Sequence, residues 1–519
     1  MFVIRAVCAT ALWVVVLSTR LFAQDITLIS PDRSVEISGT LLGFDGDYYR
    51  VETMYGELTV DGSGVLCEGP GCPNLLDFVA DFRLSGAANM GTVLMPALLE
   101  SFAAKANLRA QRVSENMALV QYELRTRSEG RLVARFHFRN TTTDEGFADL
   151  LANEADVVMA LREIRPSEAT RAAEAGLGDL RLPGRTRVLA LDALVPIVAP
   201  DNPLAAISTN DLAGVFTGQV KNWAQLGGPD AEITPYLRDA RSGLGQATND
   251  LLLAPIGASV DGGVQRRDSD SALEQAVVND PFGIGLVAQS ALRQAKPLAL
   301  TGACGFQINA ARRSVKTEDY PLTTPMFLYV PARRLPKVAR DFLTYLRSAP
   351  AQLVIRRAGF VDQTPEEIPI NAQGQRLANA IVQAGPEVDL AELQRMLAVL
   401  GPLQRLTTTF RFGAGSARLD AQSSSNVQQL AQALEAGFYD ARRLVFVGFS
   451  DGEGPARTNR DIALQRAQAV RSAVLEAAET ANLDRIEMQV DAFGEALPMA
   501  CDDSAWGRQV NRRVEVWVR

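Results

Sequence analysis

Residues 447–451 read Val-Gly-Phe-Ser-Asp, and residues 507–516 read Gly-Arg-Gln-Val-Asn-Arg-Arg-Val-Glu-Val. The first stretch ends an apolar run that begins at Leu444, and the second leads into residues that alternate up to Val518. Short apolar or alternating runs of this kind are typical of β-strands. The sequence therefore predicts strands at about residues 444–449 and 513–518, with charged side chains close to their ends.

Helical periodicity flanks the first of these strands on both sides. Apolar residues recur at i, i+3, i+4 and i+7 in one segment, namely Val427, Leu430, Ala431 and Leu434. A second segment carries Ala463, Ala467, Val470 and Val474, and residues 486–492 form a further strand-like run. Helices and strands in this order predict a compact unit of mixed α and β structure.

Residues 405–519 resemble the OmpA C-terminal family over the whole length of the segment. The markers stand in the family's order; they are residues 412–416 (Phe-Gly-Ala-Gly-Ser), residues 447–451, Asn459, residues 466–467 (Arg-Ala), residues 507–508 and residues 511–516. The resemblance implies an α+β domain that binds peptidoglycan through diaminopimelate, the zwitterionic end of the stem peptide. Phe449, Ser450 and Ala463 depart from the residues usual in the family.

The peptidoglycan-binding residues implied by this resemblance are Asp451, Arg466, Asn459 and Arg512. A carboxylate can accept hydrogen bonds from the ligand's ammonium group, and a guanidinium can bind its carboxylate with two parallel bonds. As an isolated pair, Asp451 could equally cap a turn and Arg466 could solvate a helix face. Charge pairs alone are weak evidence of function, so the assignment depends on the complete set of motifs.

Residues 363–404 precede this domain and predict a helical connector. Two helical stretches, about residues 373–383 and 390–400, are separated by Gly385-Pro386.

Residues 75–362 resemble phosphate ABC-transporter substrate-binding proteins of the type II periplasmic binding fold. The segments that carry the resemblance are residues 84–91 (LSGAANMG), 155–159 (ADVVM), 211–218 (DLAGVFTG), 222–228 (NWAQLGG), 242–243 (SG), 282–285 (FGIG), 320–322 (YPL) and 359–361 (GFV). The resemblance implies an α/β fold of two lobes around a hinged cleft, where an oxyanion binds. Leu94, Leu98 and Phe102 predict one helical face, and residues 157–159 and 195–198 predict buried strands.

The ligand-binding residues implied for the cleft are Arg238, Ser242, Gly243, Asn89, Thr142 and Thr143. Three positions depart from the family. Leu244 stands where a threonine ligand is usual, Asn89 stands where a threonine is typical, and the family's proton-accepting aspartate falls near Leu161. Arg162 and Arg241 are further cations near the expected cleft. Two hypotheses follow: a site for phosphate or another small anion, or an envelope interaction module that has lost small-ligand binding.

The N-terminal part of the chain predicts export. Residues 1–23 combine Arg5, a short apolar run and a change to polar sequence, as in a cleaved signal peptide. Residues 24–73 predict a small β unit, with strands near residues 35–37 and 48–51. Cys67 and Cys72 bracket a turn and predict a disulfide, while Cys304 and Cys501 either pair with each other or remain free.

Composition excludes several classes of function. The chain carries a formal net charge of −8 and one histidine, so neither a general affinity for nucleic acid nor a multi-histidine metal site is expected. We expect no catalytic residues, no cofactor, and no transmembrane segment in the mature chain. The sequence predicts a periplasmic protein attached non-covalently to peptidoglycan, with the outer-membrane face of the envelope as one location.

Overall fold

The computed structural model describes residues 25–74, 78–114, 116–412 and 418–519, so the predicted signal peptide lies outside the described residues. The chain divides into two compact units. Residues up to Ala80, with residues 336–338, form the first unit, and the remainder forms the second. No helix in the described ranges has the length and apolar character that a bilayer span requires.

The first unit contains a small antiparallel sheet. Its strands are β1 (Ile26–Ile29), β2 (Glu36–Phe44), β3 (Tyr48–Thr53), β4 (Gly56–Asp61) and β5 (Leu66–Glu68), in the spatial order β4-β3-β2-β1-β5. Four buried side chains, Ile26, Leu28, Tyr49 and Val51, form its core. Cys67 and Cys72 form the predicted disulfide. Closing so short a loop contributes about 2 kcal/mol in the loop-entropy model.

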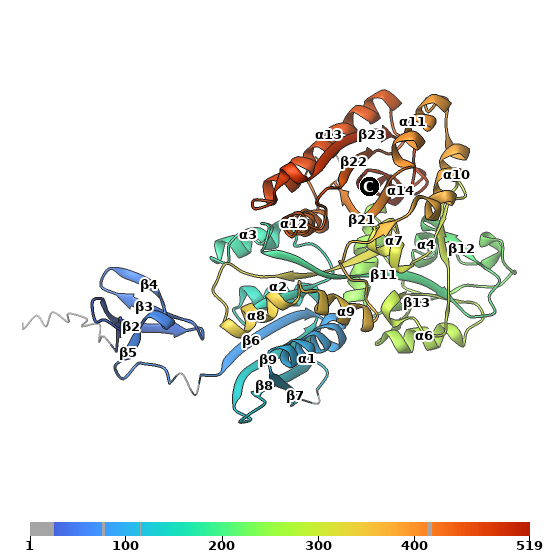
Figure 1. The fold of residues 1–519 in the computed structure, drawn as a ribbon. Helices are drawn as coiled ribbons and strands as arrows, with labels where there is room; N and C mark the ends of the chain where they lie inside the picture. The colour runs from blue at the N-terminus through green and yellow to red at the C-terminus, as the bar shows by residue number, and fades with distance from the viewer. Residues whose placement is uncertain (1–24, 75–77, 115, 413–417) are drawn as a thin grey trace, which may run out of the picture. The chain divides into compact units, whose positions relative to one another are not determined.

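A long mixed sheet organises the first part of the second unit (Figure 1). Its strands in spatial order are β14 (Gln265–Arg267), β13 (Thr234–Arg238), β15 (Gly283–Ala288), β11 (Thr186–Val198), β19 (Thr323–Tyr329), β10 (Val157–Ala160), β6 (Ala80–Ala87), β9 (Leu132–Thr141), β8 (Leu119–Thr126) and β7 (Leu108–Arg112). The first half of β11 pairs with β19 and the second half pairs with β15. Strand β11 therefore joins the two halves of the sheet.

Helices cover this sheet between the strands. They are α1 (Met95–Lys105), α2 (Thr143–Leu151), α3 (Pro166–Glu174), α4 (Thr209–Phe216), α5 (Gly243–Thr248), α6 (Asp270–Val278), α7 (Arg312–Lys316), α8 (Lys337–Tyr345) and α9 (Ala349–Arg357). A smaller sheet has the order β12 (Ala206–Ser208), β17 (Ala299–Thr301) and β18 (Gln307–Ile308). The predicted apolar helix face is confirmed, because Leu94, Leu98 and Phe102 are all buried. The predicted strands at 157–159 and 195–198 lie in β10 and β11.

The last part of the chain forms a second mixed sheet. Its order is β20 (Glu367–Ile368), β21 (Gln404–Arg411), β24 (Arg513–Val518), β22 (Arg443–Phe449) and β23 (Glu487–Gly494). Strands β22 and β23 run parallel, and α13 (Ala456–Ala477) connects them. Helix α12 (Ala421–Glu435) precedes β22, and α14 (Ala505–Asn511) precedes β24. The predicted helices and strands of this region are confirmed.

Both faces of this sheet are covered by helices (Figure 1). Leu444 and Phe446 of β22 share a core with α12 and α13. Val445 and Val447 face the other way, because side chains alternate along a strand. They share a core with α10 (Gly374–Gln383) and α11 (Leu390–Leu400). The two helices predicted as a connector are therefore part of the packing of the C-terminal sheet.

Candidate functional site

A carboxylate and two guanidinium groups meet at the C-terminal end of β22. Asp451 follows this strand and is only 8% exposed. Arg512, which immediately precedes β24, donates from Nη1 to Asp451 Oδ2 at 2.6 Å. Arg466, on α13, stacks over the ring of Phe412 with 5.3 Å between its Cζ and the ring centroid. The structure thus brings together three of the residues predicted for peptidoglycan binding.

The charges of these residues act on one another. Burial lowers the pKa of the Arg466 guanidinium, and the like charge of Arg512 lowers it further, while Asp451 acts in the opposite direction. Asp451 is therefore close to two cations, Arg466 and Arg512. Such a cluster has positive charge available for the carboxylate of a ligand.

Asn459 holds a second acidic group close to this cluster. Its Nδ2 donates to Glu495 Oε2 at 2.7 Å and to the Gly454 carbonyl at 3.3 Å. Burial raises the pKa of Glu495, and the negative charges of Glu387, Asp502 and Asp451 add to this shift. Asn459 is thus placed to position a carboxylate.

The sequence prediction missed Glu495 and Asp502. Asp502 accepts hydrogen bonds from the backbone N–H of Gly452 at 2.8 Å and from Asn511 Nδ2 at 2.8 Å. Its pKa is raised by burial, and the charge of Asp451 contributes. The available signal was Asn511 in the motif at residues 511–516, because an asparagine that is buried needs polar partners.

Two polar atoms at the cluster have no hydrogen-bond partner among the described residues. Among the described residues, neither the buried Ser450 Oγ nor Arg512 Nε makes a hydrogen bond. Buried polar atoms are almost always satisfied in folded proteins, so this position next to charged groups is a candidate for a ligand or a water molecule. Residues 413–416 of the quoted motif lie outside the described residues.

Arg238, the cation predicted for anion binding, contacts groups of the protein itself. Arg238, at the end of β13, bonds to the carboxylate of Asp270 and donates to the Asp268 carbonyl at 2.8 Å and to the Arg267 carbonyl at 3.3 Å. Arg267 ends β14, Asp270 begins α6, and Asp268 lies between these two elements. The guanidinium is thus already engaged by the protein itself.

Ser242 caps α5, and Gly243, the first residue of this helix, lies near apolar atoms of the other expected loops. Ser242 Oγ caps the helix by accepting from the Gly245 N–H at 3.0 Å, and it donates to the Asp239 carbonyl at 2.6 Å. A Cβ added at Gly243 would lie 3.0 Å from Leu161 Cδ1 and 3.7 Å from Ala87 Cβ. Leu161 therefore occupies the space between these loops.

The remaining predicted residues also serve the fold. Thr142 Oγ1 caps α2 by accepting from the Glu145 N–H at 3.1 Å, and Thr143 Oγ1 accepts from the Leu161 N–H at 3.1 Å. Asn89 differs, because its buried Oδ1 has no hydrogen-bond partner among the described residues. The two additional cations are placed as follows: Arg162 bonds to Asp144 and Glu168, and Arg241 has a side chain that is 91% exposed.

Comparison with family models identifies both parts of the second unit. Residues 118–350 match the model of the PBP superfamily domain, and residues 411–512 match the model of the OmpA family. One segment of the chain thus matches the PBP superfamily and another matches the OmpA family, and we refer to them as the PBP domain and the OmpA domain. Both resemblances stated from the sequence are confirmed.

Curated relatives of the PBP domain carry the names of phosphate-binding proteins. The phosphate-binding protein PstS of Bacillus subtilis is 30% identical over 189 residues, which is 36% of this chain and 61% of that protein. The PstS of Borreliella burgdorferi is 26% identical over 182 residues, 34% of this chain and 64% of that protein. This chain thus spans less than two thirds of the length of these relatives.

Solved structures of phosphate receptors also match. An ABC-type phosphate transport receptor from Vibrio cholerae has 19% sequence identity and a TM-score of 0.41, covering 54% of this chain and 99% of that one. A putative phosphate-binding protein from Clostridium perfringens has 17% identity and a TM-score of 0.41, with the same coverage of 54% and 99%.

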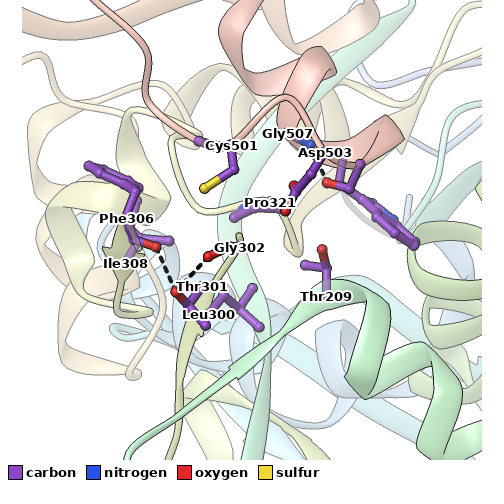
Figure 2. Close-up of a pocket in the computed structure, with 13 residues that line it drawn as sticks. Thr209, Leu300, Thr301, Gly302, Phe306, Ile308, Pro321, Cys501, Asp503 and Gly507 are labelled. Carbon is purple, nitrogen blue, oxygen red and sulfur yellow. Dashed lines mark hydrogen bonds between the residues drawn. The ribbon is translucent and has the colours of Figure 1, made fainter. Parts of the chain in front are cut away.

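Covalent and polar contacts join the PBP domain to the OmpA domain. Cys304 and Cys501, whose pairing the sequence left open, form a disulfide across the junction. Figure 2 shows Cys501 and Gly507 opposite Leu300 and Thr301 of β17. The pocket between them measures about 20 Å³, which is room for about one water molecule. The disulfide region is therefore a packed interface.

A buried charge network crosses the same junction. Arg405 of the OmpA domain donates to both carboxylate oxygens of Asp319 in the PBP domain, at 2.7 and 3.0 Å. Its Nε lies 3.4 Å from Glu515 Oε2. Glu515 also binds Arg376, and it accepts from Arg513 Nε at 2.7 Å. The attraction of these three guanidinium groups outweighs burial and holds the pKa of Glu515 far below its usual range.

Proposed function

We propose that this protein is exported to the periplasm and attaches non-covalently to peptidoglycan through its OmpA domain. The observation that carries the proposal is the cluster of Asp451, Arg466 and Arg512, beside which Ser450 Oγ and Arg512 Nε lack partners among the described residues. In this proposal the ammonium of diaminopimelate meets Asp451. The ligand's carboxylate on the same carbon meets the guanidinium groups. The membership of residues 411–512 in the OmpA family supports this assignment.

The chemistry of the ligand offers a direct test of the proposal. We expect the mature protein to cosediment with sacculi that carry free diaminopimelate, and to bind sacculi with amidated diaminopimelate at least about tenfold more weakly. Amidation removes the negative charge that two guanidinium groups would bind. Equal cosedimentation with both sacculi would mean that the wall is held through another group.

For the PBP domain we propose a role as an interaction module, the second of the two hypotheses raised by the sequence. Leu161 and Leu244 are buried next to Gly243, where an oxyanion would need polar donors. The guanidinium of Arg238 is engaged by Asp270 and two carbonyls. The disulfide to Cys501 and the Asp319–Arg405 pair support a fixed arrangement of the PBP and OmpA domains.

Inorganic phosphate is the ligand to test against this second proposal, because the curated relatives are named for it. We expect calorimetric titration of the mature protein with phosphate to give no saturable heat. Saturable phosphate binding that Arg238→Lys weakens would instead establish the small-anion site, with Asn89 and Ser242 as its further candidates. The wall-binding proposal is independent of either result.

A further inference from the structure

A cavity of about 610 Å³ lies between the PBP domain and helix α12 of the OmpA domain. Sites for small molecules commonly measure about 300–1,000 Å³. The walls come from the start of β11, from the segment between α8 and α9, and from the exposed side of α12. None of the residues predicted for peptidoglycan or anion binding lines this cavity.

Two guanidinium groups in the cavity wall have no acidic partner in the described part of the chain. Arg187 donates only to backbone carbonyls, those of Gly184 at 3.4 Å and Leu343 at 3.3 Å. Burial lowers the pKa of Arg187 to about 10, and the like charges of Arg347 and Arg185 contribute. Burial also lowers the pKa of Arg347. Within the described part of the chain, no carboxylate offsets either shift.

The other charged residues of the cavity wall are already neutralised. Arg181 Nε lies 2.9 Å from Asp179 Oδ1, and Arg442 Nη1 lies 2.6 Å from Glu367 Oε1. Arg187 and Arg347 therefore give the cavity an uncompensated positive charge. Like charges that share a partly desolvated site are unfavourable, and an anion placed between them would remove this cost.

The rest of the wall is apolar or uncharged. Leu189, Leu343 and Leu346 line the PBP side, next to the two arginines. Helix α12 contributes a row of neutral polar side chains, which are Ser424, Ser425, Gln428, Gln429 and Gln432. A ligand that matches this wall needs one anionic group and an apolar body. Inorganic phosphate or a short acidic peptide would leave the leucine wall unmatched.

We propose that this cavity binds a single acyl chain with a terminal carboxylate. The carboxylate lies between Arg187 and Arg347, where a guanidinium can form two parallel hydrogen bonds. The chain lies along Leu189, Leu343 and Leu346, and its contact with these side chains removes apolar surface from water. The ligand thus contacts both domains and would stabilise their junction.

The test is calorimetric titration of the delipidated mature protein with dodecanoate below its micellar concentration. We expect saturable binding of one dodecanoate per chain. Butyrate, which lacks the long chain, and dodecyltrimethylammonium, which reverses the charge, should each bind at least about tenfold more weakly. The double variant Arg187→Gln/Arg347→Gln should weaken dodecanoate binding about 100-fold, since it removes both guanidinium groups.

Arg181→Gln is the matched control, because Arg181 lines the cavity but is neutralised by Asp179. This variant should bind dodecanoate with the affinity of the wild type. Ser425→Trp fills the cavity from α12 without changing any charge, and it should also reduce binding. This variant keeps the test decisive if the double arginine variant does not fold. Equal binding of dodecyltrimethylammonium, or unchanged dodecanoate affinity in the folded double arginine variant or in Ser425→Trp, would overturn the proposal.

Discussion

The variants Asp451→Asn and Arg466→Gln are each expected to lose cosedimentation with purified sacculi. Asp451 is buried against Arg512, and Arg466 is a partly buried cation on the facing helix. Truncating one member of a desolvated charge pair costs about 2–5 kcal/mol of binding energy. This range corresponds to roughly a 30-fold to 5,000-fold loss of affinity, which moves the protein from the pellet to the supernatant.

A matched control comes from the same helix. Arg460 lies on α13, its side chain is 55% exposed, and its Nη1 lies 3.7 Å from Glu392 Oε2. Arg460→Gln should therefore sediment with sacculi as the wild type does. Retention of Asp451→Asn or Arg466→Gln in the pellet, with normal circular dichroism, would contradict the assignment of the site.

The second large effect concerns stability rather than binding. Glu515→Gln should reduce the free energy of unfolding by about 3–5 kcal/mol, because it leaves buried guanidinium groups without their negative partner. Glu515 is fully buried and binds Arg376 and Arg513 directly, and Arg405 lies 3.4 Å away. The expected result is a lower urea midpoint at neutral pH.

Glu367→Gln provides the comparison for this experiment. Glu367 pairs with Arg442 at 2.6 Å, but both side chains remain about one third exposed. An ion pair in contact with water contributes about 0–1 kcal/mol, so this variant should unfold close to the wild type. Equal midpoints for Glu515→Gln and the wild type would mean that the buried network does not stabilise the junction.

Local patterns predicted much of the C-terminal domain. The apolar spacing from Val427 to Leu434 corresponds to α12. All four apolar residues of this pattern are buried in the helix. The run that ends at Phe449 corresponds to β22. These predictions succeeded because a helix or a strand repeats its buried positions at a fixed interval along the sequence.

Contacts between distant segments were not predictable in this way. The disulfide between Cys304 and Cys501 joins residues 197 positions apart, and the Asp319–Arg405 pair joins two domains. Periodicity likewise predicted α10 and α11 but not the sheet face that they cover. Such contacts depend on which distant segments meet in the tertiary structure, and no local pattern in a single sequence shows this.

The sequence predicted three charged residues of the candidate site but not the two further acidic residues beside them. Asp451, Arg466 and Arg512 were identified through family motifs, and the structure brings them together. Glu495 and Asp502 were missed because they lie in the loop after β23, where neither a quoted motif nor a periodic pattern marks them.

The most direct test of wall attachment is calorimetric titration of the mature protein with a soluble stem peptide that ends in free diaminopimelate. We expect saturable binding of one peptide per chain in the wild type and no measurable binding in Asp451→Asn. Absence of heat from the wild type, or equal binding by the folded variant, would contradict the proposal that this cluster holds the cell wall.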